Sequence, residues 1–147
     1  MTLEQKSVLV VDDELDILHV IKRSLEVDGG FSHVYGFTRP LLALEYFNLN
    51  YNNCAIVLSD IRMPGMTGFE FIKRIKQINP ITKVLLMSAF EIDNNELSTS
   101  LWSIMIDDFV HKPVSPRQLT NIIQRHIVGK VGNYYNTRIW CLAFDSR

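Results

Sequence analysis

The sequence predicts an α/β protein with a doubly wound (βα)5 fold, in which five parallel strands form one sheet. Two observations predict this fold. Short apolar runs alternate along the chain with longer stretches in which apolar residues recur at helical spacing. The runs are apolar at consecutive positions, which is typical of strands covered on both faces by helices.

The predicted strands are the apolar runs themselves. Three runs are strong, at residues 8–11, 55–58 and 84–87, and two are weaker, at residues 33–37 and 108–111. Runs this short suit a strand better than a buried helix. A stretch with helical spacing follows each of them, so the chain repeats a strand and a helix five times.

The predicted helices are residues 17–25, 38–49, 67–78, 91–105 and 115–128. Several carry residues that start or stop a helix. Gly29 follows the first and Pro80 the third, and both residue types end helices. Ser115 is a suitable N-cap for the last helix, with Pro116 at its first helical position.

Composition and charge indicate one ordinary globular domain. Apolar residues make up 47% of the chain and the net charge is −1, so no overall charge favours nucleic acid. The longest apolar run has six residues, far below the roughly 18 of a membrane span. The N-terminus lacks the features of a signal peptide. Cys54 and Cys141 do not make a disulfide framework, so we expect a reducing, cytoplasmic setting.

Side chains that can bind ligands or react follow four of the five predicted strands. Asp12 and Asp13 follow the first, Asp60 the third, Ser88 the fourth and Lys112 the fifth. In open α/β sheets, ligands bind beyond the carboxyl ends of the strands. We therefore expect these side chains to meet at one edge of the sheet and to form the functional site.

The three carboxylates predict a metal site. Crowded together, Asp12, Asp13 and Asp60 would repel one another and raise one another's pKa. A divalent cation relieves this repulsion, and hard oxygen ligands select Mg²⁺ or Mn²⁺. The alternative is that Asp12 or Asp13 only caps the helix that begins near Glu14.

The complete set matches the needs of phosphoryl transfer. A metal and the Lys112 ammonium would neutralise the phosphoryl oxygens, and the Ser88 hydroxyl would donate to the same group. The nucleophile would be the Asp60 carboxylate, since carboxylates form covalent intermediates in other proteins.

Four segments together resemble the receiver domain of two-component response regulators. They are VLVVDDE, LSDIRMPGMTG, VLLMSAF and DFVHKPV, and they keep the order and spacing of that family over about residues 6–128. The resemblance implies the flavodoxin-like strand order 2-1-3-4-5. It also implies a phosphoacceptor that takes a phosphoryl group and loses it again, rather than an enzyme that turns over an external substrate.

The resemblance assigns roles to the residues at the strand ends. Asp60 would accept the phosphoryl group from a histidine kinase or a histidine phosphotransfer protein. Asp13, Asp60 and the backbone carbonyl of Arg62 would bind Mg²⁺ (or Mn²⁺), and Asp12 would act through a metal-bound water. Lys112 would pair with the phosphate, and its peptide bond to Pro113 is typically cis in this family.

The switch residues implied by the resemblance are Ser88 and Phe109. Ser88 would turn toward the phosphoryl group, and Phe109 would swing inward when it does. The alternative for Phe109 is a plain core aromatic. The chain departs from the family at Met105–Ile106, where a Gly-Ala pair is common. Arg62 and Phe90 flank the mouth of the site and should affect water access.

The expected output is protein contact. We expect residues 6–128 to form the receiver domain and residues 129–147 to be a C-terminal tail without an output domain. The partners would be the kinase or phosphotransfer protein and a downstream protein, with no direct contact to nucleic acid or membrane, and the chain would be a monomer or a weak dimer.

Two alternatives stay open. The first is a receiver-like adaptor that binds partners without phosphorylation, although all acceptor-site residues are present. The second is a phosphatase of the haloacid dehalogenase type. Those enzymes carry an Asp-x-Asp pattern after the first strand, which Asp12-Asp13-Glu14 lacks.

Overall fold

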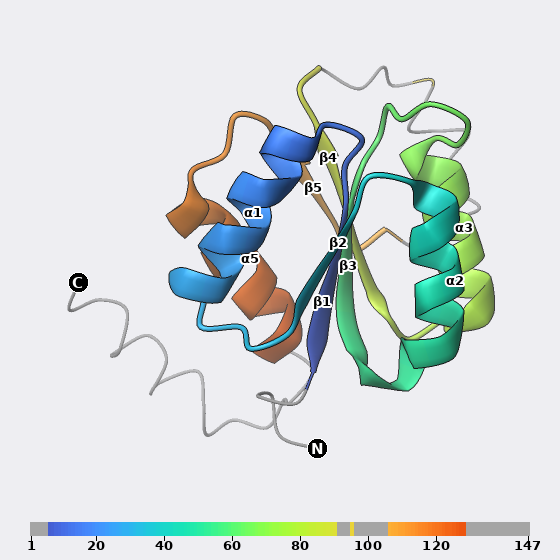
Figure 1. Cartoon of the computed structure of the whole chain (residues 1–147), viewed down its shortest axis with the longest axis horizontal. Helices are drawn as coiled ribbons and strands as arrows, with labels where there is room; N and C mark the ends of the chain where they lie inside the picture. Colours follow the sequence, from blue (N-terminus) through green and yellow to red (C-terminus); the bar gives the residue numbers. More distant parts are fainter. Residues whose placement is uncertain (1–5, 91–94, 96–105, 129–147) are drawn as a thin grey trace.

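A parallel five-stranded sheet lies between two layers of helices (Figure 1). The computed structural model describes residues 6–90, 95 and 106–128. The strands are β1 (Ser7–Val11), β2 (Val34–Phe37), β3 (Cys54–Asp60), β4 (Lys83–Ser88) and β5 (Asp108–His111). Their order is β2-β1-β3-β4-β5, and every neighbouring pair is parallel. The predicted fold class and strand order are therefore confirmed.

Helices cover both faces of the sheet. The helices are α1 (Leu15–Val27), α2 (Pro40–Asn50), the short 3-10 helix η2 (Tyr51–Asn53), α3 (Gly68–Ile78) and α5 (Pro116–Val128). In Figure 1, α1 and α5 lie on one side of the sheet, and α2 and α3 lie on the other. Of the helix predicted at residues 91–105, only residue 95 is among the described residues.

The core has two halves, one on each side of the sheet. Successive strand residues point alternately into the two halves. Val57 packs toward α2 and α3, and its neighbours Ile56 and Leu58 pack toward α1 and α5. Because residues 8–11 of β1 and residues 55–58 of β3 are all buried, these runs are apolar without alternation.

Capping residues fix where two helices begin. Thr67 caps α3, and its hydroxyl accepts the Glu70 N–H while the Glu70 carboxylate accepts the Thr67 N–H. Ser115 and Gln118 exchange the same pair of hydrogen bonds at the start of α5. The predicted N-cap at Ser115 is therefore confirmed, and both helices begin with a capping box.

Two strands extend further than predicted. The apolar run of β3 ends at Leu58, yet the strand continues through Asp60, which pairs with Met87 of β4. Likewise β4 continues through Ser88. The backbone hydrogen bonds of the ladder do not depend on side-chain polarity, so the strands carry their polar residues into the sheet. Asp60 therefore lies within the strand instead of after it, and only 8% of it is exposed.

Two structural findings concern membrane spans and cysteine. No helix among the described residues is long and apolar enough to cross a membrane. Cys54 is a free, buried thiol, and burial raises its pKa to about 11. A thiol in this state is unreactive.

Asp107 ties β5 to its neighbours at the end of the sheet opposite the predicted site. Its carboxylate accepts the Val84 N–H at 2.8 Å and forms ion pairs with Lys83 at 3.2 Å and Lys76 at 3.5 Å. Burial alone would raise the pKa of Asp107, but these three groups outweigh it and hold the pKa below its ordinary value. The sequence analysis missed this cluster.

Replacing Asp107 with alanine should lower the free energy of unfolding at neutral pH by about 2 kcal/mol, since hydrogen bonds to a charged group are lost. A depressed pKa stabilises the fold above the ordinary carboxyl pKa, and this contribution disappears as the pH falls through the depressed value. Urea unfolding at neutral and acidic pH measures both effects. The exposed Asp28, replaced by alanine, is the control, and equal losses in the two variants would contradict the prediction.

Candidate functional site

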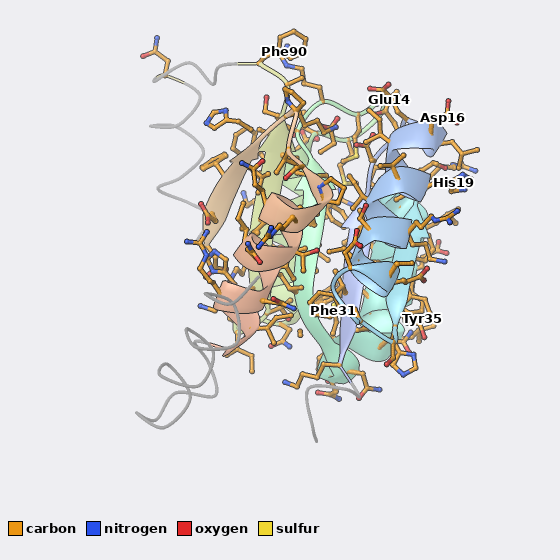
Figure 2. All side chains as sticks on the ribbon, turned by 90° about the vertical axis from the view of Figure 1, so that its left-hand side faces the viewer. Glu14, Asp16, His19, Phe31, Tyr35 and Phe90 are labelled. Carbon is orange, nitrogen blue, oxygen red and sulfur yellow. The ribbon has the colours of Figure 1, made fainter. Side chains whose placement is uncertain are left out.

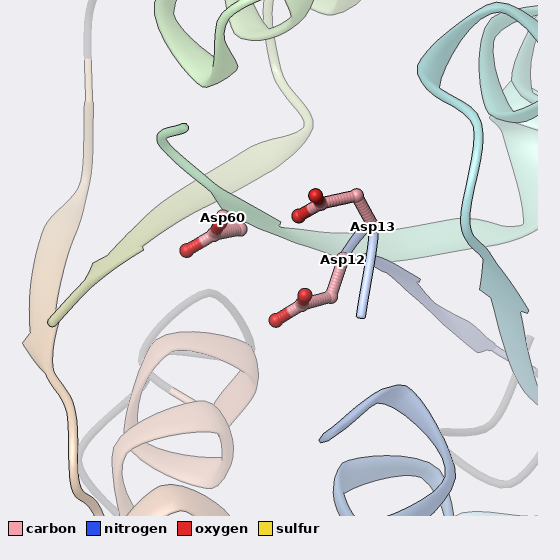
Figure 3. Close-up of side chains that lie close together, drawn as sticks. All are labelled: Asp12, Asp13 and Asp60. Atoms are coloured by element: carbon pink, nitrogen blue, oxygen red, sulfur yellow. The ribbon is translucent and has the colours of Figure 1, made fainter. Parts of the chain in front are cut away.

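The predicted carboxylates gather at the carboxyl ends of β1 and β3. Asp12 and Asp13 directly follow β1, and Asp60 is the last residue of β3. Oxygens of the three carboxylates lie within 4.8 Å of one another (Figure 3). We call these residues the acidic group. The parallel sheet creates this cluster, because β1 and β3 are neighbours that end at the same edge.

Lys112 joins the acidic group from the end of β5. Its Nζ lies 2.7 Å from Oδ2 of Asp12 and 3.1 Å from Oδ1 of Asp60. Sequence placed Lys112 at this edge of the sheet but did not indicate its ion pair with Asp12. The Asp12 side chain is completely buried and that of Lys112 is 14% exposed, so the ammonium compensates a carboxylate that water does not reach.

The Asp12 side chain also accepts a hydrogen bond from the backbone. Its Oδ1 accepts the N–H of Glu14, the residue before α1, at 2.9 Å. The two interpretations of Asp12, a helix-start residue and a member of the acidic site, are therefore compatible. Because each oxygen has a separate partner, Asp12 is held in a fixed orientation.

The charges at the site shift the pKa of Asp60 and Lys112. Burial is the main cause of a raised pKa at Asp60; Lys112 opposes it, and the nearby Asp12 and Asp13 add to it. Burial alone would lower the pKa of Lys112, but Asp12 and Asp60 outweigh that effect and raise it. The expected repulsion among the carboxylates is therefore present.

The chemistry of the acidic group fits a hard divalent cation. Three carboxylates against one ammonium leave a net charge of −2, which a dication balances. Among the described residues, the structure gives Lys112 as the partner of Asp12 and Asp60, whereas Asp13 has no hydrogen bond or ion pair. The carboxylate of Asp13 is therefore available to a metal.

Ser88 ends β4 and Phe109 lies in β5, and among the described residues no hydrogen bond joins either side chain to the acidic group. The Ser88 hydroxyl donates to the Phe90 carbonyl at 2.9 Å and accepts the Phe90 N–H at 3.1 Å. Phe109, in β5, is partly buried and packs against the core half on the side of α2 and α3. Core packing thus accounts for its present position.

Backbone hydrogen bonds of one residue, Ile61, hold both ends of the β3–α3 loop. The Ile61 N–H donates to Met87, and its carbonyl accepts the N–H of Gly68, the first residue of α3. A Cβ on Gly68 would lie 2.3 Å from the Asp60 carbonyl oxygen. Only glycine permits this close approach, so Gly68 helps to set the position of Asp60.

Two further observations concern the rim of the site. The peptide bond between Lys112 and Pro113 is cis, as the resemblance implied. Arg62 stacks on Phe90, with the guanidinium carbon 5.1 Å from the ring centroid. Sequence placed both residues at the mouth but gave no sign that they contact each other. Met105 lies outside the described residues.

Comparison with known proteins identifies the family. The family model of the response regulator receiver domain matches residues 8–124. The response regulator SaeR of Staphylococcus aureus is 27% identical over 137 residues, which cover 93% of this chain and 57% of SaeR. This chain therefore spans little more than half the length of the curated relatives it matches.

Solved structures agree with the family match. The chemotaxis protein CheY4 of Vibrio cholerae has a TM-score of 0.71 at 26% identity, covering 82% of this chain and 98% of that one. A CheY-like receiver domain protein from Methanospirillum hungatei has a TM-score of 0.74 at 27% identity, covering 86% and 98%. With the family model matched across all five strands and the acidic group in place, the chain belongs to the response regulator receiver domain family.

Proposed function

We propose that Asp60 is the phosphoacceptor of a two-component signalling pathway and that phosphorylation switches a protein-binding surface. The observation that carries this proposal is the surroundings of Asp60. One carboxylate lies within reach of two others and of a lysine ammonium, at the edge of the sheet where α/β proteins bind ligands. These neighbouring carboxylates and the ammonium suit the transfer of a charged phosphoryl group.

In the proposed reaction, an Asp60 carboxylate oxygen attacks the phosphorus of a phosphohistidine on a kinase or phosphotransfer protein. A new P–O bond forms as the P–N bond breaks, and the electron pair stays with the imidazole. Lys112, already 3.1 Å from Asp60, would move its ion pair to a phosphoryl oxygen. Ser88 would donate to another oxygen.

Mg²⁺ or Mn²⁺ would supply further positive charge to the phosphoryl oxygens. Asp13, Asp60 and the backbone carbonyl of Arg62 would hold it, with Asp12 acting through a water. Asp13 supports this assignment because its carboxylate has no partner among the described residues.

The proposal also covers the switch residues and the state of the chain in the cell. Ser88 and Phe109 would change position together when Asp60 is phosphorylated, and a downstream protein would bind the changed surface. We further propose a receiver domain at residues 6–128, a cytoplasmic location, and a monomer or weak dimer.

Incubation with acetyl phosphate and Mg²⁺ tests the proposal. Intact-mass measurement should show a gain of one phosphoryl group that requires Mg²⁺ and disappears in Asp60→Asn. The control is Asp28→Asn, an equal charge change at an exposed site. If the wild type gains no mass, the chain is an adaptor that works without phosphorylation. If Asp60→Asn gains as much mass as the wild type, Asp60 is not the phosphoacceptor.

The Asp60→Asn variant should remain folded, so its result is interpretable. The pKa of Asp60 is raised in the folded state, so the folded protein loses stability as the pH rises from the ordinary carboxyl pKa through the raised value. Asparagine removes this loss. At neutral pH the variant should therefore be at least as stable as the wild type in urea unfolding.

A further inference from the structure

The exits of β3 and β4 are joined by the contact between Arg62 and Phe90. Asp60 and Met87 are paired in the sheet, so the residues beyond them leave the sheet side by side. Arg62 lies two residues after Asp60, and its guanidinium stacks on the Phe90 ring at 5.1 Å. Phe90 lies at the same end of the molecule as Glu14 and Asp16 (Figure 2). The contact therefore lies at the mouth of the acidic group.

The backbone of Phe90 holds the Ser88 hydroxyl. Ser88 donates to the Phe90 carbonyl and accepts from the Phe90 N–H, at 2.9 and 3.1 Å. A hydroxyl has one proton to donate. Ser88 cannot donate to a phosphoryl group on Asp60 until it releases the Phe90 carbonyl.

We infer that the Arg62–Phe90 stack is a brake on phosphorylation. The stack holds Phe90 where its carbonyl captures the Ser88 proton, and so keeps Ser88 away from the reaction. Arg62 and Phe90 are then positioning residues that act through Ser88. This inference depends on the proposed function, because it assigns Ser88 a bond to the incoming phosphoryl group.

The brake works by setting how many chains have a free Ser88 hydroxyl. Only chains in which Ser88 has left Phe90 are ready to react, so the phosphorylation rate is proportional to their fraction. An exposed cation–π contact favours the state in which Ser88 is bonded to the Phe90 backbone by about two- to five-fold. Loss of the stack should raise the ready fraction by the same factor.

The brake acts on phosphorylation and leaves hydrolysis unchanged, in contrast to the expectation from sequence that Arg62 and Phe90 control water access. In phosphorylation by acetyl phosphate, an Asp60 oxygen bonds to phosphorus and acetate leaves with the electron pair. In hydrolysis, water bonds to phosphorus, the bond to Asp60 breaks, and the products are phosphate and a free carboxylate. Ser88 has already left Phe90 before hydrolysis begins, so the stack no longer affects the rate.

Phe90→Leu is the decisive variant, because it removes the ring and keeps every charge. We expect its rate of phosphorylation by acetyl phosphate, followed by intact mass, to rise about two- to five-fold. Its rate of phosphoryl loss after removal of the donor should equal that of the wild type. Phe90→Tyr, which keeps a ring, should behave as the wild type does.

Arg62 provides the second arm of the test. Arg62→Met should raise the rate in the wild-type background and have no such effect in Phe90→Leu, since the two residues act through one contact. Arg74→Met removes the same charge from the exposed face of α3 and controls for the loss of attraction to the anionic donor.

Three outcomes would overturn the inference. Faster phosphoryl loss in Phe90→Leu would show that the ring only shields the site from water. An unchanged phosphorylation rate, with Asp60 still phosphorylated, would reject the brake and leave the proposed function intact. A wild type that gains no phosphoryl group would reject both.

Discussion

Replacing Lys112 with methionine is expected to lower the free energy of unfolding at neutral pH by about 3–5 kcal/mol, the cost of breaking a buried ion pair from one side. Lys112 bonds to the completely buried carboxylate of Asp12 and to Asp60. Without the ammonium, two neighbouring carboxylates remain with no compensating charge. Guanidinium unfolding measures the change.

Three further measurements separate this effect from a general loss of packing. The destabilisation should shrink on acidification, because protonation removes the uncompensated charges. Asp12→Asn should restore part of the stability of Lys112→Met. Mg²⁺ should stabilise Lys112→Met more than the wild type, since it replaces the lost cation. A loss below about 1 kcal/mol, typical of an exposed pair, would contradict the buried pair.

Gly68→Ala should damage stability and phosphorylation together. Its Cβ would lie 2.3 Å from the Asp60 carbonyl oxygen and 2.9 Å from Cα of Ile61, and both obstacles are backbone atoms. Overpacking of this kind costs about 3 kcal/mol at its upper end. Because Asp60 itself must shift, we also expect phosphorylation by acetyl phosphate to slow by about 100-fold, the effect of a displacement of roughly 1 Å.

Gly65→Ala is the matched control in the same loop. Gly65 has a positive φ of 82°, but its Cβ would meet no atom within 4 Å. The variant should lose about 1–2 kcal/mol from backbone strain alone and keep its phosphorylation rate. If Gly68→Ala matches Gly65→Ala in both measurements, the close approach to Asp60 does not position the carboxylate.

The sequence predicted the sheet well because the physical signal is local. Strands such as β1 are buried on both faces, so every residue from Ser7 to Val11 is excluded from water. The resulting apolar runs identify the strands, and their ends locate Asp12, Asp60 and Lys112. Parallel topology then brings these residues together without any detail of packing.

The sequence could not predict which polar groups would pair. Asp12 and Lys112 are 100 residues apart, and Lys76 and Asp107 are 31 apart. Such pairs depend on side-chain directions in the folded chain, and neither periodicity nor composition records them. The partner of the Ser88 hydroxyl is also hidden, because a serine at a strand end has the same appearance whether it points at Phe90 or at Asp60.

The closure of the β3–α3 loop on Ile61 has a consequence for how such a protein diverges. Both ends of the loop are fastened through Ile61, the residue that follows β3, so changes within residues 62–67 need not move the strand that carries Asp60. The chemistry depends on the strand ends, and the stack that we infer to set its pace depends on Arg62, inside the loop. Mutation can therefore adjust the speed of the response while the reacting carboxylate stays in place.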